Sequence, residues 1–179
     1  FTDRFWGRIP LESGAAMYFF HRKSPIQQAL HRLKYKHQAD IGIRIGRQFG
    51  YLLAKVPQFK LAEGLIPVPL HPQKERLRGY NQSAMLATGL AESLNIPVFS
   101  DVLIRQRVSE TQTRKKRMDR FENVSEVFAL RHPERIQGRH LLLVDDVLTT
   151  GATLEACGKV LLEAPGVRLS MATIAIAMR

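Results

Sequence analysis

Two adjacent carboxylates and a cluster of hydroxyl side chains stand close together in this sequence. Asp145 and Asp146 follow the apolar run 141–144, and the stretch 149–153 reads Thr-Thr-Gly-Ala-Thr. Carboxylates accept hydrogen bonds from sugar hydroxyls, and a loop of glycine and threonine at the start of a helix presents backbone N–H groups to a phosphate. The pattern therefore indicates a site for a ribose 5-phosphate.

The alternative is a strand, a turn and a helix whose polar residues only cap the helix. An N-cap side chain accepts a hydrogen bond from the first turn of a helix, so capping accounts for one of the threonines. It accounts neither for the adjacent acids nor for the cluster of three threonines in 149–153. We therefore favour the ligand site.

A second stretch suited to binding anions covers residues 70–82. Arg76 and Arg78 carry planar guanidinium groups that match phosphate oxygens, and Gly79 lets the backbone approach a ligand closely. Cations in a loop are commonly no more than a solvated surface, which is the alternative here. Next to a ribose-phosphate site the stretch becomes a candidate for binding a pyrophosphate group, with these members: Leu70, His71, Arg76, Arg78 and Gly79.

The apolar pattern predicts the elements that would position these residues. Strands are expected at 16–20, 65–69, 102–104, 124–130, 141–144 and 167–178, and helices at 27–36, 41–55, 82–94 and onward from 154. The polar stretch 71–81 is expected to be a loop, and residues 1–10 show no clear periodicity. Strands that alternate with helices are typical of an α/β fold with a mostly parallel sheet flanked by helices. In such sheets ligands bind beyond the carboxyl ends of the strands, where we place the acid pair.

The stretch 141–153 resembles the signature of the type I phosphoribosyltransferases, which bind phosphoribosyl pyrophosphate (PRPP). A narrower resemblance is to the ComF family of phosphoribosyltransferase-like proteins, which are associated with bacterial competence and DNA uptake. It rests on the runs 66–71 (Ile-Pro-Val-Pro-Leu-His) and 78–82 (Arg-Gly-Tyr-Asn-Gln). Further agreement comes from 33–35 (Leu-Lys-Tyr), Thr111, Gln112, Arg120, Asn123 and Phe128. The resemblance extends from about residue 18 to the C-terminus and implies a type I phosphoribosyltransferase-like fold.

The resemblance assigns roles to the residues singled out above. It implies that Asp145 and Asp146 bind the 2′ and 3′ hydroxyls of the PRPP ribose. It also implies that the 5′-phosphate is bound by Thr149, Thr150, Gly151, Ala152 and Thr153. Mg²⁺ is expected to arrive with PRPP and to be held mainly by pyrophosphate and ribose oxygens, so no metal site built by the protein is expected.

Two departures from the family pattern bear on activity. Purine-salvage relatives carry an aspartate in place of Thr149, and a threonine hydroxyl is neither an acid nor a base near pH 7, so no catalytic residue is assigned. Many ComF-like proteins begin with a cysteine-rich zinc module, whereas this sequence has a single cysteine, Cys157. We divide the chain into an N-terminal segment, 1–60, which is part of the same domain or a cap, and a phosphoribosyltransferase-like core, 61–179.

Cations are concentrated between residues 105 and 120. The resemblance implies that this segment is a flexible loop that closes over the site, excludes water and contacts the leaving pyrophosphate. The alternatives are contact with the phosphates of single-stranded DNA and a solvated, disordered loop. DNA binding would fall steeply with ionic strength, which separates these interpretations. The candidate residues are Gln112, Arg114, Lys115, Lys116, Arg117 and Arg120.

The overall charge of the chain limits the classes of partner that are expected. A net charge of +11 and a pI near 10.3 indicate a polyanionic partner, either nucleic acid or a ligand with several phosphates; the alternative is that the charge only keeps the protein soluble. No apolar run is long enough to span a membrane and no signal peptide is recognisable, so a cytoplasmic location is expected.

Together these features predict a ComF-like protein that binds PRPP or a related ribose 5-phosphate and serves DNA uptake. Its expected partners are the ligand, the competence machinery and, through the cationic segment, single-stranded DNA. The alternative is an active phosphoribosyltransferase that transfers the phosphoribosyl group of PRPP to an unidentified base or amine.

Overall fold

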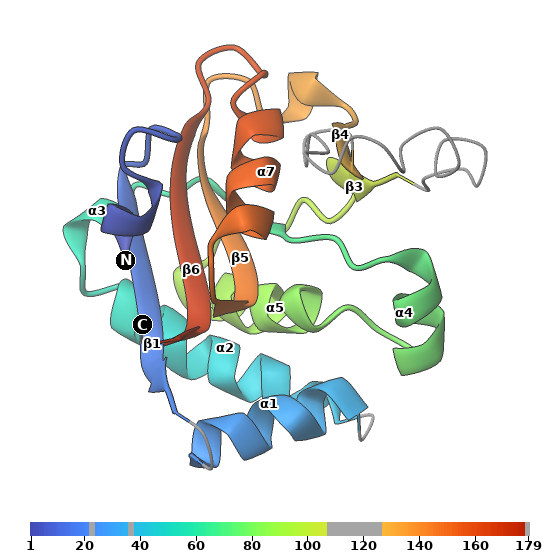
Figure 1. Cartoon of the computed structure of the whole chain (residues 1–179). Coiled ribbons are helices and arrows are strands. Elements are labelled where there is room, and N and C mark those ends of the chain that lie inside the picture. The colour runs from blue at the N-terminus through green and yellow to red at the C-terminus, as the bar shows by residue number, and fades with distance from the viewer. Residues whose placement is uncertain (22–23, 36–37, 107–126, 178–179) are drawn as a thin grey trace.

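The centre of the fold is a parallel sheet. A computed structural model describes residues 1–21, 24–35, 38–106 and 127–177, and in these residues the sheet has four strands in the order β1-β6-β5-β2. The strands are β1 (Ser13–Phe20), β2 (Gly64–Pro67), β5 (His140–Leu148) and β6 (Arg168–Ala177). All neighbouring strands of this sheet run parallel, and helices lie on both of its faces (Figure 1). The expected α/β fold with a mostly parallel sheet is therefore confirmed.

The central strand β5 shows why its sequence is apolar at successive positions. Leu141 and Leu143 belong to one buried cluster, whereas Leu142 and Val144 belong to the cluster on the other face. Successive strand side chains point to opposite faces, so a strand that is covered on both faces is apolar throughout. The expected end at residue 144 is wrong, because β5 continues to Leu148 and includes the acid pair.

One face of the sheet is covered by α7 (Ala152–Leu161) and by the start of the chain. The opening residues form a short 3-10 helix, η1 (Thr2–Phe5), which buries Phe5 in this core. An antiparallel pair, β3 (Leu103–Arg105) and β4 (Phe128–Leu130), forms a separate small sheet, followed by η3 (Pro133–Arg135). Of the strand expected at 124–130 the structure shows Phe128–Leu130 as β4, and residues 124–126 lie outside the described residues.

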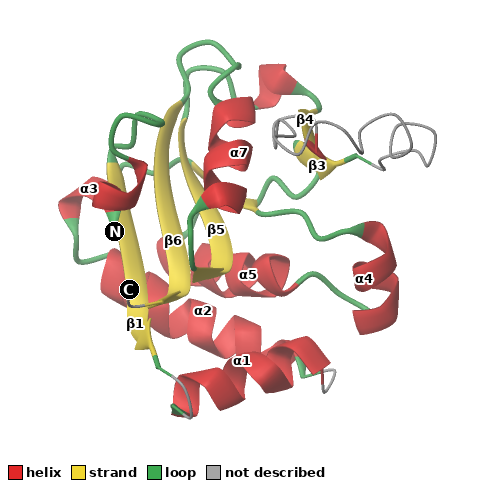
Figure 2. Cartoon of the chain, in the orientation of Figure 1, coloured by secondary structure: helices red, strands yellow, loops and turns green. Residues whose placement is uncertain are grey.

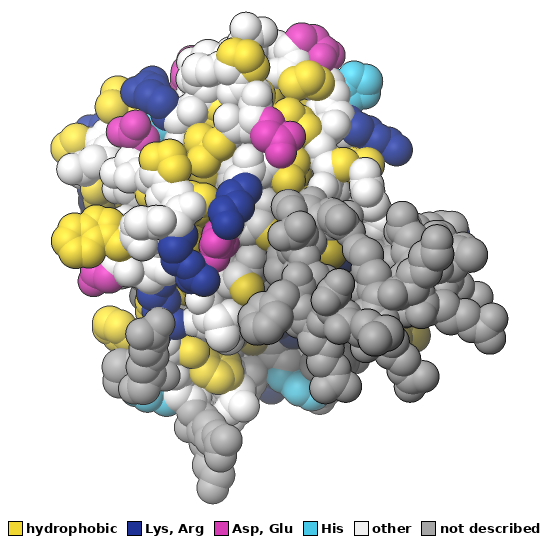
Figure 3. All heavy atoms as spheres, turned by 45° about the horizontal axis from the view of Figure 1, so that its top comes forward, with side chains coloured by type: hydrophobic (Ala, Val, Ile, Leu, Met, Phe, Trp, Pro, Cys, Tyr) yellow, Lys and Arg dark blue, Asp and Glu magenta, His cyan; other side chains and the backbone are white. Residues whose placement is uncertain are grey.

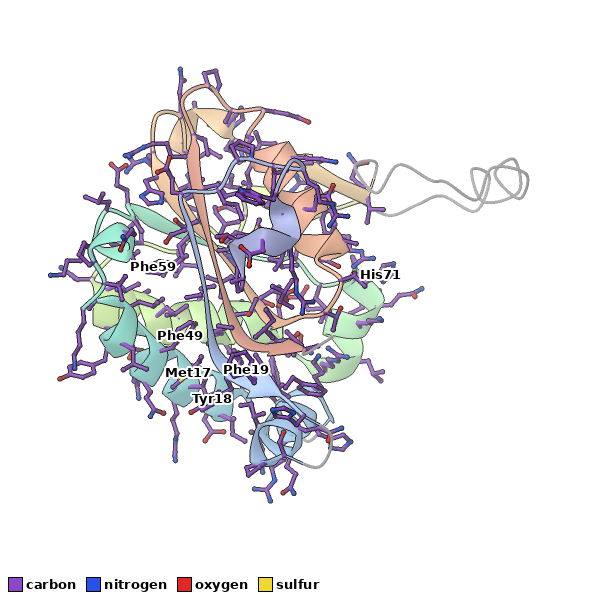
Figure 4. All side chains as sticks on the ribbon, turned by 60° about the vertical axis from the view of Figure 1, so that its left-hand side comes forward. Met17, Tyr18, Phe19, Phe49, Phe59 and His71 are labelled. Carbon is purple, nitrogen blue, oxygen red and sulfur yellow. The ribbon has the colours of Figure 1, made fainter. Side chains whose placement is uncertain are left out.

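The opposite face is packed against α1 (Pro25–Tyr35), α2 (Ala39–Leu53), α3 (Pro57–Lys60) and α5 (Gln82–Leu94). In this core Phe49 of α2 lies with Met17 of β1 (Figure 4). The helices α2 and α5 cross so closely that a Cβ atom on Gly89 would lie 2.0 Å from the carbonyl oxygen of Ile43. The helix α1 lies beyond the carboxyl ends of β1 and β6 (Figure 2), where the acid pair of β5 is also found.

The expected loop at 71–81 is wrong, because it contains the two-turn helix α4 (Pro72–Arg78). His71 caps this helix, since its Nδ1 accepts a hydrogen bond of 3.2 Å from the backbone N–H of Gln73. Pro72 suits the first helical position, and Gly79, with a φ of 80°, ends the helix in the left-handed conformation. These start and stop signals outweigh the polar composition, and α4 projects from the body of the molecule (Figure 1).

The N-terminal segment 1–60 contributes β1 to the same sheet as the remainder of the chain, through pairing with β6. The division of the chain at residue 60 stays a prediction. Among the helices of the described ranges, none combines the length and the apolar character that a membrane crossing requires.

Candidate functional site

The acid pair lies near the carboxyl end of β5, between β6 and β2. The chain that leaves β2 begins beside it, because the N–H of Val68 donates a hydrogen bond of 2.9 Å to the carbonyl of Val144. Asp145 and Asp146 are successive residues of one strand, so their side chains point to opposite faces of the sheet. The two carboxylates therefore have different surroundings.

Asp145 is held by two donors and is partly buried. Its Oδ1 accepts a hydrogen bond of 2.9 Å from Ser83 Oγ, in the first turn of α5, and one of 2.8 Å from the backbone N–H of Asp146. Loss of hydration and the negative charge of Asp146 raise the pKa of Asp145 to about 7, against the opposing effect of these hydrogen bonds. Asp145 therefore exchanges a proton near neutral pH.

Asp146 forms an ion pair with a residue of α1. The Nζ of Lys34, in the last turn of α1, lies 2.6 Å from its Oδ2, and the two side chains are 28% and 14% exposed. Lys34 belongs to the Leu-Lys-Tyr stretch that supports the family resemblance, but no pattern in the sequence indicated that it contacts Asp146. The structure thus adds Lys34 to the candidate site.

The hydroxyl-rich loop 149–153 surrounds a small hollow that also includes Asp145. The hollow measures about 40 Å³ and is lined by Asp145 and residues 147–154, which is room for roughly three water-sized groups. The structure therefore brings one carboxylate and the whole predicted 5′-phosphate loop together. Asp146 does not line this hollow.

The start of α7 leaves hydrogen-bond donors available to the hollow. Its N-cap residue is Gly151, with a φ of 89°, and the helix has no side-chain cap among the described residues. The N–H of Ala152 makes only a long contact of 3.4 Å with Thr150 Oγ1. This contact is weak capping by one threonine, and the remaining N–H groups of the first turn and the helix dipole favour an anion.

Residues at the start of the chain contact the loop 149–153 and hold it in place. The guanidinium of Arg4 donates hydrogen bonds to the carbonyl oxygens of Thr149 and Ala177. Gly151 packs against the Phe5 ring, since a Cβ atom at Gly151 would lie 3.1 Å from Phe5 Cε1. The sequence gave no indication of this support, because residues 1–10 lack a periodic pattern.

The predicted pyrophosphate residues are spread over the segment between β2 and α4, α4 itself and the residue that ends it. Leu70 and His71 are partly buried in front of α4, where Figure 4 labels His71, and Arg76 is exposed on that helix. Arg78 and Gly79 end α4. The two ends of this stretch therefore lie near the acid pair, since Val68 before it bonds Val144 and Ser83 after it bonds Asp145, whereas Arg76 lies on the projecting helix.

The neighbouring residues of the family motif 78–82 connect the elements around the site. Tyr80 donates its hydroxyl hydrogen to the carbonyl of Leu33, in the last turn of α1, and burial raises its pKa although the charge of Arg78 opposes this. Asn81 caps α5 and its Nδ2 donates a hydrogen bond of 2.9 Å to the carbonyl of Val68. The motif thereby holds α1, α5 and the end of β2 around the acid pair.

The candidate residues of the cationic segment, Gln112, Arg114, Lys115, Lys116, Arg117 and Arg120, lie outside the described residues. In the described part of the chain no group of three or more His, Cys, Asp or Glu side chains is placed to hold a metal ion. The acid pair itself is engaged by Ser83 and Lys34.

Comparison with known proteins identifies the family. Residues 81–178 match the phosphoribosyl transferase domain. The chain is 34% identical over 146 residues to Competence protein F of Haemophilus influenzae, a match that covers 79% of this chain and 63% of that protein. It is 32% identical to the DNA utilization protein YhgH of Escherichia coli, over 77% of this chain and 61% of that protein. Competence protein ComFC of Bacillus subtilis is 33% identical, over 77% of this chain and 54% of that protein.

The chain thus spans less than two thirds of the length of these relatives. Among solved structures, a purine phosphoribosyltransferase from Pyrococcus horikoshii superposes with a TM-score of 0.45 at 16% identity, over 74% of this chain and 71% of that chain. The domain match covers more than half of the residues and includes the acid pair and the loop after it. This chain belongs to the ComF family and has a phosphoribosyl transferase domain.

Proposed function

We propose that this chain binds a ribose 5-phosphate ligand, either PRPP or a related compound, at the hollow formed by residues 145 and 147–154. The observation that carries the proposal is that Asp145 and the uncapped start of α7 line one hollow. A carboxylate suits the hydroxyls of a sugar phosphate, and a set of N–H donors suits its phosphate group.

In the proposed complex the 5′-phosphate binds the N–H groups of Ala152 and Thr153 and the hydroxyls of Thr149 and Thr150. The positive end of the α7 dipole stabilises the bound anion. The ribose hydroxyls donate hydrogen bonds to the acid pair, for which Asp145 is accessible from the hollow. The motif 78–82 and α4 then border the C1 side of the sugar, where a pyrophosphate group is attached in PRPP.

The donor set of the site suits Mg²⁺ that is delivered with the ligand. Both carboxylates already have partners in Ser83 and Lys34, so neither forms part of a preassembled cage for a cation. Mg²⁺ characteristically keeps several waters and binds substrate phosphates with one or two carboxylates. The ion would therefore be held mainly by the pyrophosphate and ribose oxygens, and it would neutralise the phosphate charge.

The proposal is tested by isothermal titration calorimetry with PRPP and Mg²⁺ at moderate salt. We expect wild type to bind and the double variant Asp145→Asn/Asp146→Asn to lose at least tenfold in affinity, about 1.4 kcal/mol. The matched control is Asp101→Asn, which changes an exposed carboxylate paired with Arg135 and should bind as wild type does. Wild type that is folded but binds neither PRPP nor ribose 5-phosphate would refute the proposal.

A role in DNA uptake or utilization is the second part of the proposal. The relatives are named competence and DNA utilization proteins, and the net charge of +11 favours polyanions. Figure 3 shows basic and acidic side chains interspersed on the face that it presents, so the described residues of this face offer no uninterrupted cationic track. Fluorescence anisotropy with labelled single-stranded DNA tests the role. We expect binding at low salt that falls steeply as salt rises, and no binding at low salt would reject direct contact.

An active phosphoribosyltransferase is the second candidate function, and one observation favours it. A carboxyl with a pKa of about 7, Asp145, lies in the proposed ligand site, and general acids and bases work best when their pKa is near the operating pH. The test is pyrophosphate release from PRPP across a panel of bases and amines. Release that requires Asp145 would establish transfer, and no release with any acceptor would reject it.

A further inference from the structure

Both carboxylates of the acid pair have protein partners before any ligand is bound. Asp145 accepts hydrogen bonds from Ser83 Oγ at 2.9 Å and from the N–H of Asp146 at 2.8 Å. Asp146 lies 2.6 Å from Lys34 Nζ. Each carboxylate therefore keeps a protein partner when no sugar hydroxyl is bound, and each has an oxygen left to accept from a ligand.

The partner of Asp146 is held in place by the fold. Lys34 lies in the last turn of α1, and the preceding residue, Leu33, is completely buried. The carbonyl of Leu33 accepts a hydrogen bond from the hydroxyl of Tyr80, which fixes this turn against the segment that leads into α5. Because its helix is anchored next to the site, Lys34 can remain with Asp146 whether or not a hydroxyl is present.

Partners of this kind determine how strictly a site rejects a ligand that lacks a hydroxyl. Sites that use buried polar groups to bind a hydroxyl can reject the analogue without it by about 10⁴- to 10⁵-fold, because the buried group is left unpaired. Here the carboxylates keep Ser83 and Lys34 when the hydroxyl is missing. The loss is then confined to the hydrogen bond from the ligand.

We propose that the site binds 2-deoxyribose 5-phosphates as well as ribose 5-phosphates, and that Lys34 is the positioning residue that permits this. The inference rests on the proposed ribose-phosphate site and specifies its ligand class. The ligand class does not depend on which acid meets the 2′ position, since both acids are partnered, whereas the role of Lys34 requires that Asp146 meets it. The ligand class would then include the sugar phosphates of DNA as well as those of RNA.

The test compares the dissociation constants of ribose 5-phosphate, 2-deoxyribose 5-phosphate and inorganic phosphate, measured by calorimetry. For wild type we expect the deoxy sugar to bind less than about tenfold more weakly than the ribose compound. Lys34→Met should raise this ratio at least about tenfold, because Asp146 then has no partner when the hydroxyl is absent. The affinity for inorganic phosphate should not change, because the phosphate loop is left intact.

Two variants act as controls. Lys34→Arg retains a cation in the same turn and should keep the wild-type ratio. Lys55→Met makes the same chemical change at an exposed lysine that lies over the ring of Tyr51 on α2, and it should also keep the ratio. A change in the ratio at Lys34 alone separates the positioning role from a general effect of lost charge or stability.

The outcomes separate this inference from the proposed function. Ribose 5-phosphate that binds wild type while the deoxy sugar is rejected a hundredfold or more would overturn only the inference. An unchanged ratio of the two sugar dissociation constants in Lys34→Met would show that Lys34 has no positioning role. Failure of wild type to bind ribose 5-phosphate would reject the site and the inference together. If Lys34→Met does not fold, the wild-type ratio and Lys34→Arg still decide the ligand class.

Discussion

Replacement of Asp145 by asparagine should stabilise the protein at neutral and alkaline pH. The pKa of this carboxyl is raised from 3.8 to about 7 in the folded protein, so the folded state holds its proton more tightly than the unfolded state does. Wild-type stability therefore falls as pH rises between these two values and stays lower above them. Asparagine keeps an Oδ1 that accepts the hydrogen bonds from Ser83 Oγ and the N–H of Asp146, but it carries no charge.

The expected size of the effect follows from the shift in pKa. A shift of about three units, at about 1.4 kcal/mol each, sets an upper limit of about 4 kcal/mol. Because the side chain is only partly buried, we expect Asp145→Asn to raise the free energy of unfolding by about 1–3 kcal/mol at pH 8. At pH 4 the folded state is protonated and the unfolded state is close to its titration midpoint, so the difference should be below about 1 kcal/mol.

The assay is urea unfolding of both proteins at pH 4, 6 and 8, analysed with one dependence of the unfolding free energy on urea concentration (m-value) for both. The matched control is Asp101→Asn, in which the exposed carboxyl has a lowered pKa because Arg135 donates a hydrogen bond to it. That variant should not gain stability at high pH. A difference for Asp145→Asn that is zero at pH 8, or that is the same at every pH, would refute the account of this carboxyl.

Other substitutions test the framework around the site. Gly89→Ala should lower the free energy of unfolding by about 3 kcal/mol or more, because the new Cβ would lie 2.0 Å from the carbonyl oxygen of Ile43. Gly79→Ala is the control, because a Cβ there meets nothing within 4 Å although the φ is 80°, and it should lower the free energy of unfolding by only about 1–2 kcal/mol. Equal losses for the two variants, measured by urea unfolding, would contradict the close crossing of α2 and α5. Arg4→Ala should weaken calorimetric binding of inorganic phosphate severalfold, because Thr149 loses its support. Arg8→Ala removes an ion pair between the half-exposed Arg8 and Glu155, which keeps Lys159 as a partner, and should leave binding near wild type. Equal effects of the two variants would contradict the role of Arg4.

The sheet and the loop 149–153 that leads into α7 were predictable because their signals are local. An apolar run of the kind at 141–144 belongs to a strand covered on both faces, and the glycine at 151 with its threonines marks the start of a helix. The strand nevertheless continues through Asp145 and Asp146. Charged residues at the edge of a core suggest the end of a strand, whereas here Ser83 and Lys34 supply the partners that let it continue.

The parts that the sequence did not reveal depend on contacts between distant segments. Lys34 meets Asp146 and Arg4 meets Thr149 only after the chain has folded, and neither residue stands in a pattern that names its partner. The helix α4 was missed for a different reason. Its signals, His71 and Pro72 at the start and Gly79 at the end, were present, but the polar composition between them favoured a loop.

The most direct measurement of the central claim is a ¹H–¹⁵N NMR titration of the labelled protein with PRPP and Mg²⁺, repeated with ribose 5-phosphate. The account predicts that the backbone amide signals of residues 151–154 shift with the bound fraction, because their N–H groups receive the 5′-phosphate. The amide of Asp146 should shift with them, since it is hydrogen-bonded to Asp145. Saturable binding that shifts other amides and leaves 151–154 unchanged would contradict the claim.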